Sequence, residues 1–281
     1  MAVRIVTDSA CDLSDELVAT HGITVVPLSI RFGDEEFVDR EELSVDDFYA
    51  KMATSDVLPE TAAPAPGAFD QAFRRIGDAG DEVVCINLSA ALSATMQSAA
   101  TAATALEGTV AVTVVDSKAL TIGLGNIVVA AAQAAAGGAS ADEVVARAEE
   151  LSARTRMWGA LDTLENLQKG GRIGKAQAML GGMLSIKPVI DMSTGEVHEA
   201  AKPRTRKKSL LWLRDKVAEF PEIENLWVME GMATDDAQEL VSLLQAERDD
   251  PINVGRIGPV IGAHGGPGVL GVSFWVPAGT D

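Results

Sequence analysis

The segment from Val83 to Leu106 (VVCINLSAALSATMQSAATAATAL) limits the fold of this chain more than any other. Its opening residues are apolar enough for a buried strand, and a turn of small residues then leads into an alanine-rich helix. Ser89, Ser93 and Thr95 cluster where that helix begins. Because a helix N-terminus carries unsatisfied N–H groups and partial positive charge, hydroxyls beside it can help to hold a carboxylate or a phosphate. The alternative is a serine that only caps the helix.

Strands and helices alternate through the N-terminal half of the sequence. The predicted strands are Arg4–Thr7, Ile23–Leu28, Val83–Leu88 and Val110–Val115. The predicted helices are Leu13–His21, Ser44–Ala53, Leu124–Ala136 and Ala141–Arg154, with a further helix after the proline-rich loop Pro59–Gly67. Gly33 and Asp34 indicate a hairpin turn, and Ser44 and Ser140 are candidate helix caps. This alternation is typical of a parallel sheet covered by helices.

Polar residues stand at the ends of three predicted strands. They are Asp8-Ser9, Ser89 and Asp116-Ser117. Ligands of parallel α/β sheets bind beyond the carboxyl ends of the strands. The pattern therefore predicts a site along one edge of the sheet.

The pattern changes after about Thr155. Gly181–Ala200 predicts a strand pair joined by a Ser-Thr-Gly turn, and further strands and helices follow without regular alternation. We therefore predict two domains, an N-terminal α/β domain at residues 1–155 and a C-terminal mixed α+β domain at residues 156–281.

Charge and cysteine content exclude several classes of protein. The formal net charge is −18, and without a long basic stretch nucleic-acid binding is not expected. Cys11 and Cys85 form no disulfide framework, and Cys85 is expected in the core. Three scattered histidines show no zinc spacing, so we expect no metal and no cofactor. With neither a signal peptide nor a long apolar run expected, we predict a cytoplasmic protein.

Two glycine-rich segments carry chemically useful side chains. Lys169–Lys175 (KGGRIGK) places Arg172 among glycines that allow a ligand to approach closely, but it lacks the spacing of a P-loop. Gly262–Gly268 (GAHGGPG) surrounds His264, which is expected to titrate near neutral pH and to donate hydrogen bonds to an anion. The alternatives are an exposed turn with a solvated arginine, and a structural loop with an incidental histidine.

One basic cluster stands out in this acidic chain. It spans Lys202–Lys208 (KPRTRKK) and includes Lys202, Arg204 and Arg206. It is a candidate docking patch for an acidic partner or a ligand head group. The alternative is a solvated loop that leads into a helix.

Together these segments resemble the signature motifs of the DegV family, in the order in which that family has them. The matching segments are VRIVTDS (Val3–Ser9), PET (Pro59–Thr61), LSAT (Leu92–Thr95), Asp116-Ser117, GGRI (Gly170–Ile173), IKP (Ile186–Pro188) and IGPVIGAHGGPG (Ile257–Gly268). The resemblance covers nearly the whole chain, from Val3 to about Trp275.

The resemblance implies a two-domain protein, without catalytic turnover of its own, that holds a long-chain fatty acid in an apolar tunnel between its domains. It further implies that the protein presents the fatty acid carboxylate to a separate fatty acid kinase, which forms an acyl phosphate for phospholipid synthesis. Ser93, Thr61, Arg172 and His264 match the family positions near the carboxylate.

The sequence departs from the family pattern at two hydroxyl positions. Ala62 follows Thr61 where the family often has Ser or Thr, and Ala90 follows Ser89 where the family has paired serines. A lost hydrogen bond to a charged group is worth about 1.5–3 kcal/mol, which places the head-group geometry in question.

A fatty acid also fits the physical chemistry of the chain. About 15 buried methylenes contribute on the order of 12 kcal/mol before costs, so the tail would supply most of the affinity. Ala94, Met179, Met183 and Leu184 are candidate lining residues, with ordinary core packing as the alternative. A transient contact with a membrane surface is also expected.

Two other classes of function compete with this interpretation. One is a serine esterase that uses Ser93 and His264 with an acid such as Asp8, although the G-x-S-x-G elbow is missing at Ser93. The other is a structural or regulatory protein without a ligand.

Overall fold

A computed structural model describes residues 1–180 and 186–279. The chain forms two compact units: unit 1 comprises Met1–Leu43 and Thr61–Ala153, and unit 2 comprises Ser44–Glu60 and Arg154–Asp281. A boundary between domains at residues 155 and 156 stays a prediction. The units interleave in sequence, because Ser44–Glu60 packs with residues of the C-terminal half.

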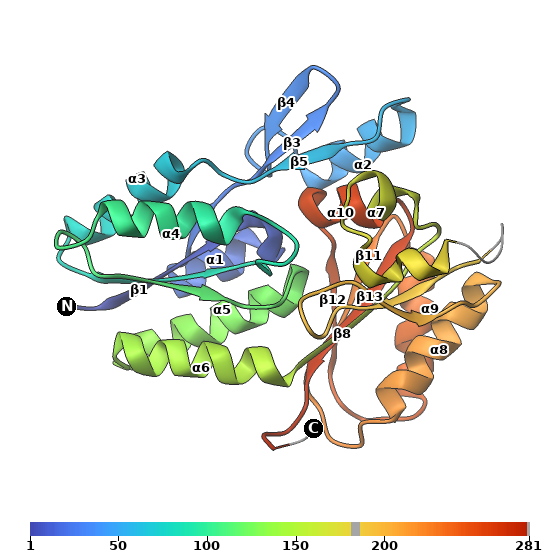
Figure 1. Cartoon of the computed structure of the whole chain (residues 1–281). Coiled ribbons are helices and arrows are strands. Elements are labelled where there is room, and N and C mark those ends of the chain that lie inside the picture. The colour runs from blue at the N-terminus through green and yellow to red at the C-terminus, as the bar shows by residue number, and fades with distance from the viewer. Residues whose placement is uncertain (181–185, 280–281) are drawn as a thin grey trace. The chain divides into compact units, whose positions relative to one another are not determined.

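Unit 1 is built on a four-stranded parallel sheet in the order β2-β1-β6-β7 (Figure 1). Its strands are β1 (Val3–Asp8), β2 (Thr24–Val26), β6 (Glu82–Asn87) and β7 (Val112–Asp116). The two central strands are buried along most of their length, as their apolar composition predicts. The predicted parallel α/β class is confirmed.

Helices cover both faces of this sheet. They are α1 (Asp15–His21), α3 (Pro66–Gly77), α4 (Thr95–Ala105), α5 (Thr121–Ala136) and α6 (Ala141–Arg154), with a short 3₁₀ helix, η1, at Ser9–Cys11. Figure 1 shows α3 and α4 over one face of the sheet and α5 against the other. Phe69, Phe73 and Cys85 are fully buried between the sheet and α3 and α4, which confirms that Cys85 is a core residue.

Short-range signals in the sequence determine several element ends. Gly33, with φ +60°, makes the turn between β3 (Ser29–Phe32) and β4 (Glu35–Val38), which pair antiparallel as predicted. With β5 (Glu60–Ala62) they form a small sheet in the order β4-β3-β5. Ser44 accepts a hydrogen bond from Asp47 N at the start of α2 (Val45–Thr54), and Ser140 accepts one from Glu143 N at the start of α6. Both predicted caps are confirmed.

Unit 2 contains a six-stranded mixed sheet in the order β10-β9-β8-β13-β11-β12. Its strands are β8 (Thr155–Ala160), β9 (Val189–Asp191), β10 (His198–Ala201), β11 (Glu224–Gly231), β12 (Ile252–Arg256) and β13 (Val269–Trp275). Only β11 and β12 pair in parallel, and the other neighbouring pairs are antiparallel. The predicted mixed α+β character of this part of the chain is therefore confirmed.

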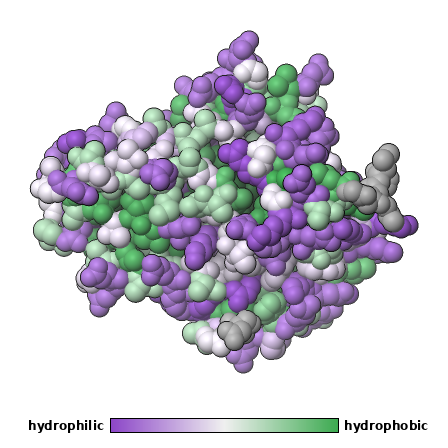
Figure 2. Space-filling view, viewed as in Figure 1, coloured by the Kyte–Doolittle hydropathy of each residue, from purple (hydrophilic) through white to green (hydrophobic). Residues whose placement is uncertain are grey.

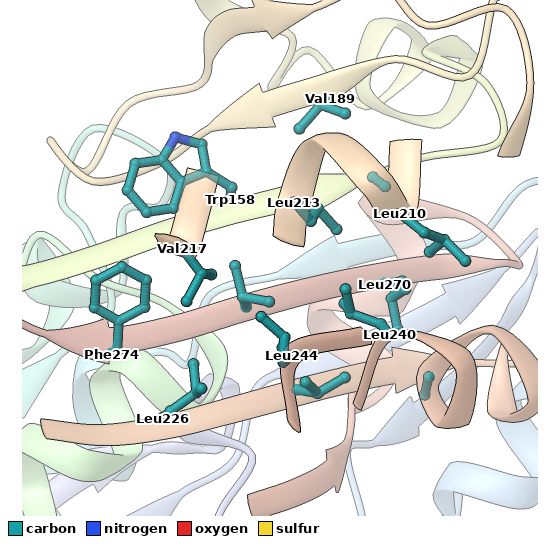
Figure 3. Close-up of a cluster of buried hydrophobic side chains, with 14 of the residues drawn as sticks. Trp158, Val189, Leu210, Leu213, Val217, Leu226, Leu240, Leu244, Leu270 and Phe274 are labelled. Carbon is teal, nitrogen blue, oxygen red and sulfur yellow. The ribbon is translucent and has the colours of Figure 1, made fainter. Parts of the chain in front are cut away.

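The core of unit 2 lies between its sheet and two long helices. The helices of this unit are α2, α7 (Glu165–Lys169), α8 (Arg206–Ala218), α9 (Thr234–Gln245) and α10 (Pro259–Gly265), with a 3₁₀ helix, η2, at Gly174–Met179. Figure 3 shows Trp158 and Phe274 from the sheet beside Val217 of α8 and Leu244 of α9. The sheet and these helices pack closely through these buried side chains. The strands therefore form a rigid support for the loops described below.

Candidate functional site

The polar strand ends predicted at one edge of the unit 1 sheet meet through hydrogen bonds. Asp8, the last residue of β1, accepts hydrogen bonds from the backbone N–H of Leu88 at 2.9 Å and from the side chain of Asn87 at 3.0 Å. Asp116, the last residue of β7, accepts one from Ala90 N at 3.2 Å. The carboxylates at the ends of β1 and β7 thus both contact the chain that leaves β6. Polar groups therefore gather at this edge of the sheet, and a ligand site there stays a prediction.

The turn between β6 and α4 presents two hydroxyls. Ser93 N and Leu92 N both donate to Ser89 O, and Ser93 Oγ accepts from Thr95 N at 3.3 Å. Ser93 Oγ also lies 2.9 Å from Thr95 Oγ1. The N-cap of α4 is Ala94, whose side chain offers no cap. The helix begins beside the Ser93 hydroxyl without a side-chain acceptor from its own N-cap residue, and this arrangement suits an anionic head group.

The surface around this turn is formed by small residues. Most of α4 is alanine or threonine, and Figure 2 shows a pale surface of intermediate hydropathy where Figure 1 places α4. Ala94 is exposed there. Thr61 lies in β5 and is half-buried, and Ala62 after it is exposed.

In unit 2, Arg172 lies in a loop shaped by glycines. The loop follows α7, where Gly170 caps the helix and Gly171 adopts φ +70°. Arg172 Nη1 donates to Gly170 O at 2.7 Å, and the side chain is half-buried. The segment packs closely against α10: a Cβ on Gly170 would lie 2.5 Å from His264 Nδ1. Glycine at 170 therefore leaves space for the imidazole.

His264 occupies a helix, which corrects the predicted loop. Residues Pro259–Gly265 form α10, with Pro259 in the first turn, where its missing N–H costs nothing, and Gly266 at φ +77° directly after the last residue. Glycines in this segment serve close packing inside the helix: a Cβ on Gly262 would lie 2.6 Å from Tyr49 Oη. The density of glycines therefore reflects packing as well as turns.

The protonation of His264 also differs from the prediction. Burial is the main cause that lowers its pKa to about 4, and the nearby Arg172 guanidinium contributes to the same shift. His264 is therefore neutral at pH 7 and offers a neutral N–H donor, with Arg172 supplying the positive charge. A carboxylate bound beside the imidazole would oppose both effects and raise this pKa.

One residue of this cluster was missed from the sequence. Asn166, in α7, is buried and donates from Nδ2 to Ala263 O at 3.1 Å, which attaches α7 to α10 beside His264. A Cβ on Gly266 would lie 3.0 Å from its Oδ1. The short helix gives too little periodicity to show which of its polar side chains is buried.

The candidate tail-lining residues of unit 2 are only partly described by the structure. Met179, at the end of η2, is 1% exposed. Met183 and Leu184 lie outside the described residues.

The basic cluster is partly used within unit 2. Lys202 pairs with Glu199 at 3.0 Å, and Arg206 pairs with Asp236 at 2.7 Å while only 17% of its side chain is exposed. Arg204, Lys207 and Lys208 are exposed. Arg206 therefore stabilises the start of α8, and the exposed charge of the cluster belongs to Lys202, Arg204, Lys207 and Lys208.

Among residues 1–180 and 186–279, no group of three or more His, Cys, Asp or Glu side chains is arranged to hold a metal ion. Within the same residues, no helix has the length and apolarity needed to cross a membrane.

The fold and these groups define a class of protein: a two-unit α/β protein whose parallel sheet presents a hydroxyl turn at a helix N-terminus and whose mixed sheet carries an arginine and a histidine. A sequence model of the DegV family, described as an uncharacterised protein family, matches residues 2–276. The chain belongs to the DegV family.

Curated and solved relatives extend over the whole chain. A DegV domain-containing protein of Streptomyces coelicolor is 36% identical over 96% of this chain and 97% of its own. A solved DegV family protein from Thermus thermophilus, described as fatty acid binding, is 31% identical with a TM-score of 0.91 and covers 99% of this chain and 100% of its own. A stearic acid-binding protein from Eubacterium ventriosum is 28% identical with a TM-score of 0.89, covering 98% of each chain.

Proposed function

We propose that this protein binds a long-chain fatty acid and presents its carboxylate to a separate fatty acid kinase, which transfers phosphate from ATP to form an acyl phosphate. The observation that carries the binding step is the full-length similarity to a solved DegV family protein described as fatty acid binding, at 31% identity and a TM-score of 0.91. Three further solved relatives at 25% identity or above are also described as fatty acid binding.

Side chains of both units support a carboxylate ligand. A carboxylate removed from water needs donors or a counter-charge, and unit 1 offers the Ser93 hydroxyl beside the start of α4. We assign Ser93 and Thr61 to the head group, and we assign Arg172 and His264 of unit 2 to it as well. Arg172 would supply charge, and neutral His264 would supply one N–H donor.

The kinase step depends on a second protein, and the exposed part of the basic cluster is its proposed contact. Lys202, Arg204 and Arg206 are the docking residues expected from sequence, and Arg204 is the exposed member that forms no ion pair within residues 1–180 and 186–279. In this proposal the chain performs no turnover of its own, carries no cofactor, acts in the cytoplasm and touches membranes only transiently.

The esterase alternative is less well supported. A serine hydrolase needs an acid that orients its histidine. Asp8, the acid that this alternative would use, accepts hydrogen bonds from Leu88, Asn87 and Ala10 inside unit 1. Those donors already determine its orientation.

The proposed function is tested by identifying the bound ligand. We expect native mass spectrometry of the purified protein to show one added fatty acid, which solvent extraction releases and identifies together with its chain length and unsaturation. An empty protein that also takes up neither oleate nor stearate would contradict the proposal. Turnover of a chromogenic ester that disappears in Ser93→Ala would support the esterase instead.

The kinase step is tested separately with the loaded protein. Acyl phosphate should form only when the loaded protein, ATP and a fatty acid kinase are all present. A loaded protein that supports no acyl phosphate with any such kinase would leave binding intact and contradict the presentation step.

A further inference from the structure

A buried carboxylate lies directly behind the candidate head-group turn of unit 1. Asp8 is 0% exposed, and its two oxygens accept three hydrogen bonds: Oδ2 from Leu88 N and Asn87 Nδ2, and Oδ1 from Ala10 N at 3.1 Å. Leu88 and Asn87 end β6, so Asp8 attaches the end of that strand to the end of β1. Acceptor oxygens that receive three donors are best satisfied by an ionised carboxylate.

The backbone from Leu88 to Ser93 links this carboxylate to the Ser93 hydroxyl. Leu88 is followed directly by Ser89, whose backbone carbonyl accepts from Leu92 N and Ser93 N. Ser93 Oγ then accepts from Thr95 N, the first residue of α4. A change at Asp8 therefore acts on the turn through the backbone of Leu88, which precedes Ser93 by five residues.

Asp39 is a second buried carboxyl in the same unit, and it has the opposite surroundings. It is 1% exposed, and neither carboxyl oxygen accepts a hydrogen bond from the described residues. A buried carboxyl without donors is stable as the neutral acid. Between the two, Asp8 is the group built to carry negative charge.

Several titratable and charged groups lie around Asp8. They are Cys85 in β6, Cys11 in η1, and Asp12, Asp39 and Arg40 in the loops beside them. Burial raises the pKa of Cys11 to about 12 and that of Cys85 well above its usual range, so both thiols are neutral near pH 7. Burial raises the pKa of Asp8 to about 6, and its three hydrogen-bond donors oppose that rise.

We propose that Asp8 is the positioning residue of the Ser89–Thr95 turn, and that protonation of its carboxyl at mildly acidic pH releases this turn and weakens binding of the ligand head group. A protonated carboxyl accepts these three donors less well and leaves Leu88 N, Asn87 or Ala10 N short of an acceptor. The inference rests on the proposed fatty acid function, because it assigns a role toward that head group.

The test compares oleate binding by the wild-type protein and Asp8→Asn between pH 5 and pH 8. Asparagine resembles the protonated acid. We therefore expect the wild-type protein to bind oleate about tenfold more tightly than Asp8→Asn at pH 8, and less than about twofold more tightly at pH 5. Taking the ratio of the two affinities cancels the ionisation of oleate itself. Asp70→Asn, which changes an exposed carboxylate paired with Arg74 on α3, is the matched control and should give a ratio near one throughout.

Each result separates this inference from the proposed function. Wild-type protein that fails to bind oleate at any pH would contradict the proposed function. Oleate affinity that is unchanged in Asp8→Asn would overturn the positioning role. An affinity reduced by the same factor at every pH would also overturn it, because a merely structural defect has no reason to disappear near pH 5.

A second variant and a second measurement cover the case in which Asp8→Asn does not fold. Asn87→Ala removes one donor from the Asp8 carboxylate, so the pH at which binding weakens should move upward. Amide exchange adds a readout without ligand: in the wild-type protein, protection of Leu88 and Ser93 should fall as the pH drops through about 6. An unmoved midpoint in Asn87→Ala, or constant protection in the wild-type protein, would overturn the proposal.

Discussion

Unit 1 and unit 2 hold their candidate ligand groups by different physical means. In unit 1, the Ser93 turn is fixed by hydrogen bonds to carboxylates at strand ends, with Asp8 buried and Asp116 nearer the surface. In unit 2, His264 is fixed by volume, because Gly170 leaves just enough space for its ring. The unit 1 turn should therefore be sensitive to protonation, and the unit 2 cluster to added atoms.

The largest effect is expected at Asp39, the buried carboxyl of unit 1 without donors. Its pKa is raised to about 7, chiefly by burial and in smaller part by Asp12 and Asp8, while Arg40 opposes the rise. The Ser9 hydroxyl also lowers it, although its geometry falls short of a hydrogen bond. From an ordinary value of 3.8 up to about 7, the unfolded chain has released this proton while the folded chain still holds it. Stability contributed by this group therefore falls as the pH rises through that window.

Asp39→Asn removes this cost. We expect the variant and the wild-type protein to have similar unfolding free energies near pH 4, and the variant to be more stable by on the order of 4 kcal/mol at pH 8. Urea unfolding at several pH values measures the difference. Asp70→Asn is the control at an exposed carboxylate, and an Asp39→Asn difference that does not change with pH would contradict the expected proton affinity.

The next effect is expected at the unit 1 hydroxyl itself. Ser93→Ala removes a hydrogen bond to a charged group, worth about 1.5–3 kcal/mol, so oleate affinity should fall about 10-fold to 150-fold. Ser98→Ala, at a half-buried serine of the same helix, is the matched control and should leave affinity within about twofold. Fluorescence displacement of a bound fatty acid probe measures both variants, and equal affinities would remove Ser93 from the head-group site.

A somewhat smaller effect, of the steric kind, is expected in unit 2. In Gly170→Ala the new Cβ would lie 2.5 Å from His264 Nδ1 and 3.0 Å from Asn166 O, so the ring must move. We expect a loss of about 1–3 kcal/mol in unfolding free energy and a pKa of His264 that rises from about 4 toward its ordinary 6.5 as the ring becomes more solvated. NMR titration of the imidazole follows that change.

Gly171→Ala separates added volume from backbone strain. Gly171 has open space around its Cβ position but adopts φ +70°, so alanine there costs about 1–2 kcal/mol without approaching the imidazole. The pKa of His264 should stay where it is. If both variants shift it equally, the steric account of this cluster is wrong.

Much of unit 1 follows from short-range rules, and this explains where sequence reasoning succeeded. The Gly33 turn and the Ser140 cap, like the Ser44 cap of unit 2, depend on residues close in sequence. The parallel sheet followed from the alternation of strand and helix patterns. The polar edge followed because parallel strands place their carboxyl ends together.

Other features depend on contacts that a single sequence does not display. The segment Ser44–Glu60 belongs to unit 2 because Tyr49 donates to Ile257 O, 208 residues away. The neutral state of His264 arises from burial and from Arg172, and neither is visible in the glycine pattern around it. Likewise, only three-dimensional contacts show that Asp8 receives three donors while Asp39 receives none.

The smallest effect is expected at the basic cluster of unit 2, where neither buried charge nor close packing operates. Exposed ion pairs contribute about 0–1 kcal/mol each, so replacing Arg204, Lys207 and Lys208 together by Glu should weaken association with a fatty acid kinase severalfold at low salt and less at high salt. Surface plasmon resonance against the kinase at several ionic strengths measures this change. Arg75→Glu, at an exposed position of α3 in unit 1, changes the net charge as much as Arg204→Glu alone and is the matched control for that single variant. Arg206→Ala should instead lower stability, because its guanidinium pairs with Asp236 inside unit 2. Kinase affinity that falls equally with Arg75→Glu and Arg204→Glu would show that overall charge, and not this cluster, governs docking.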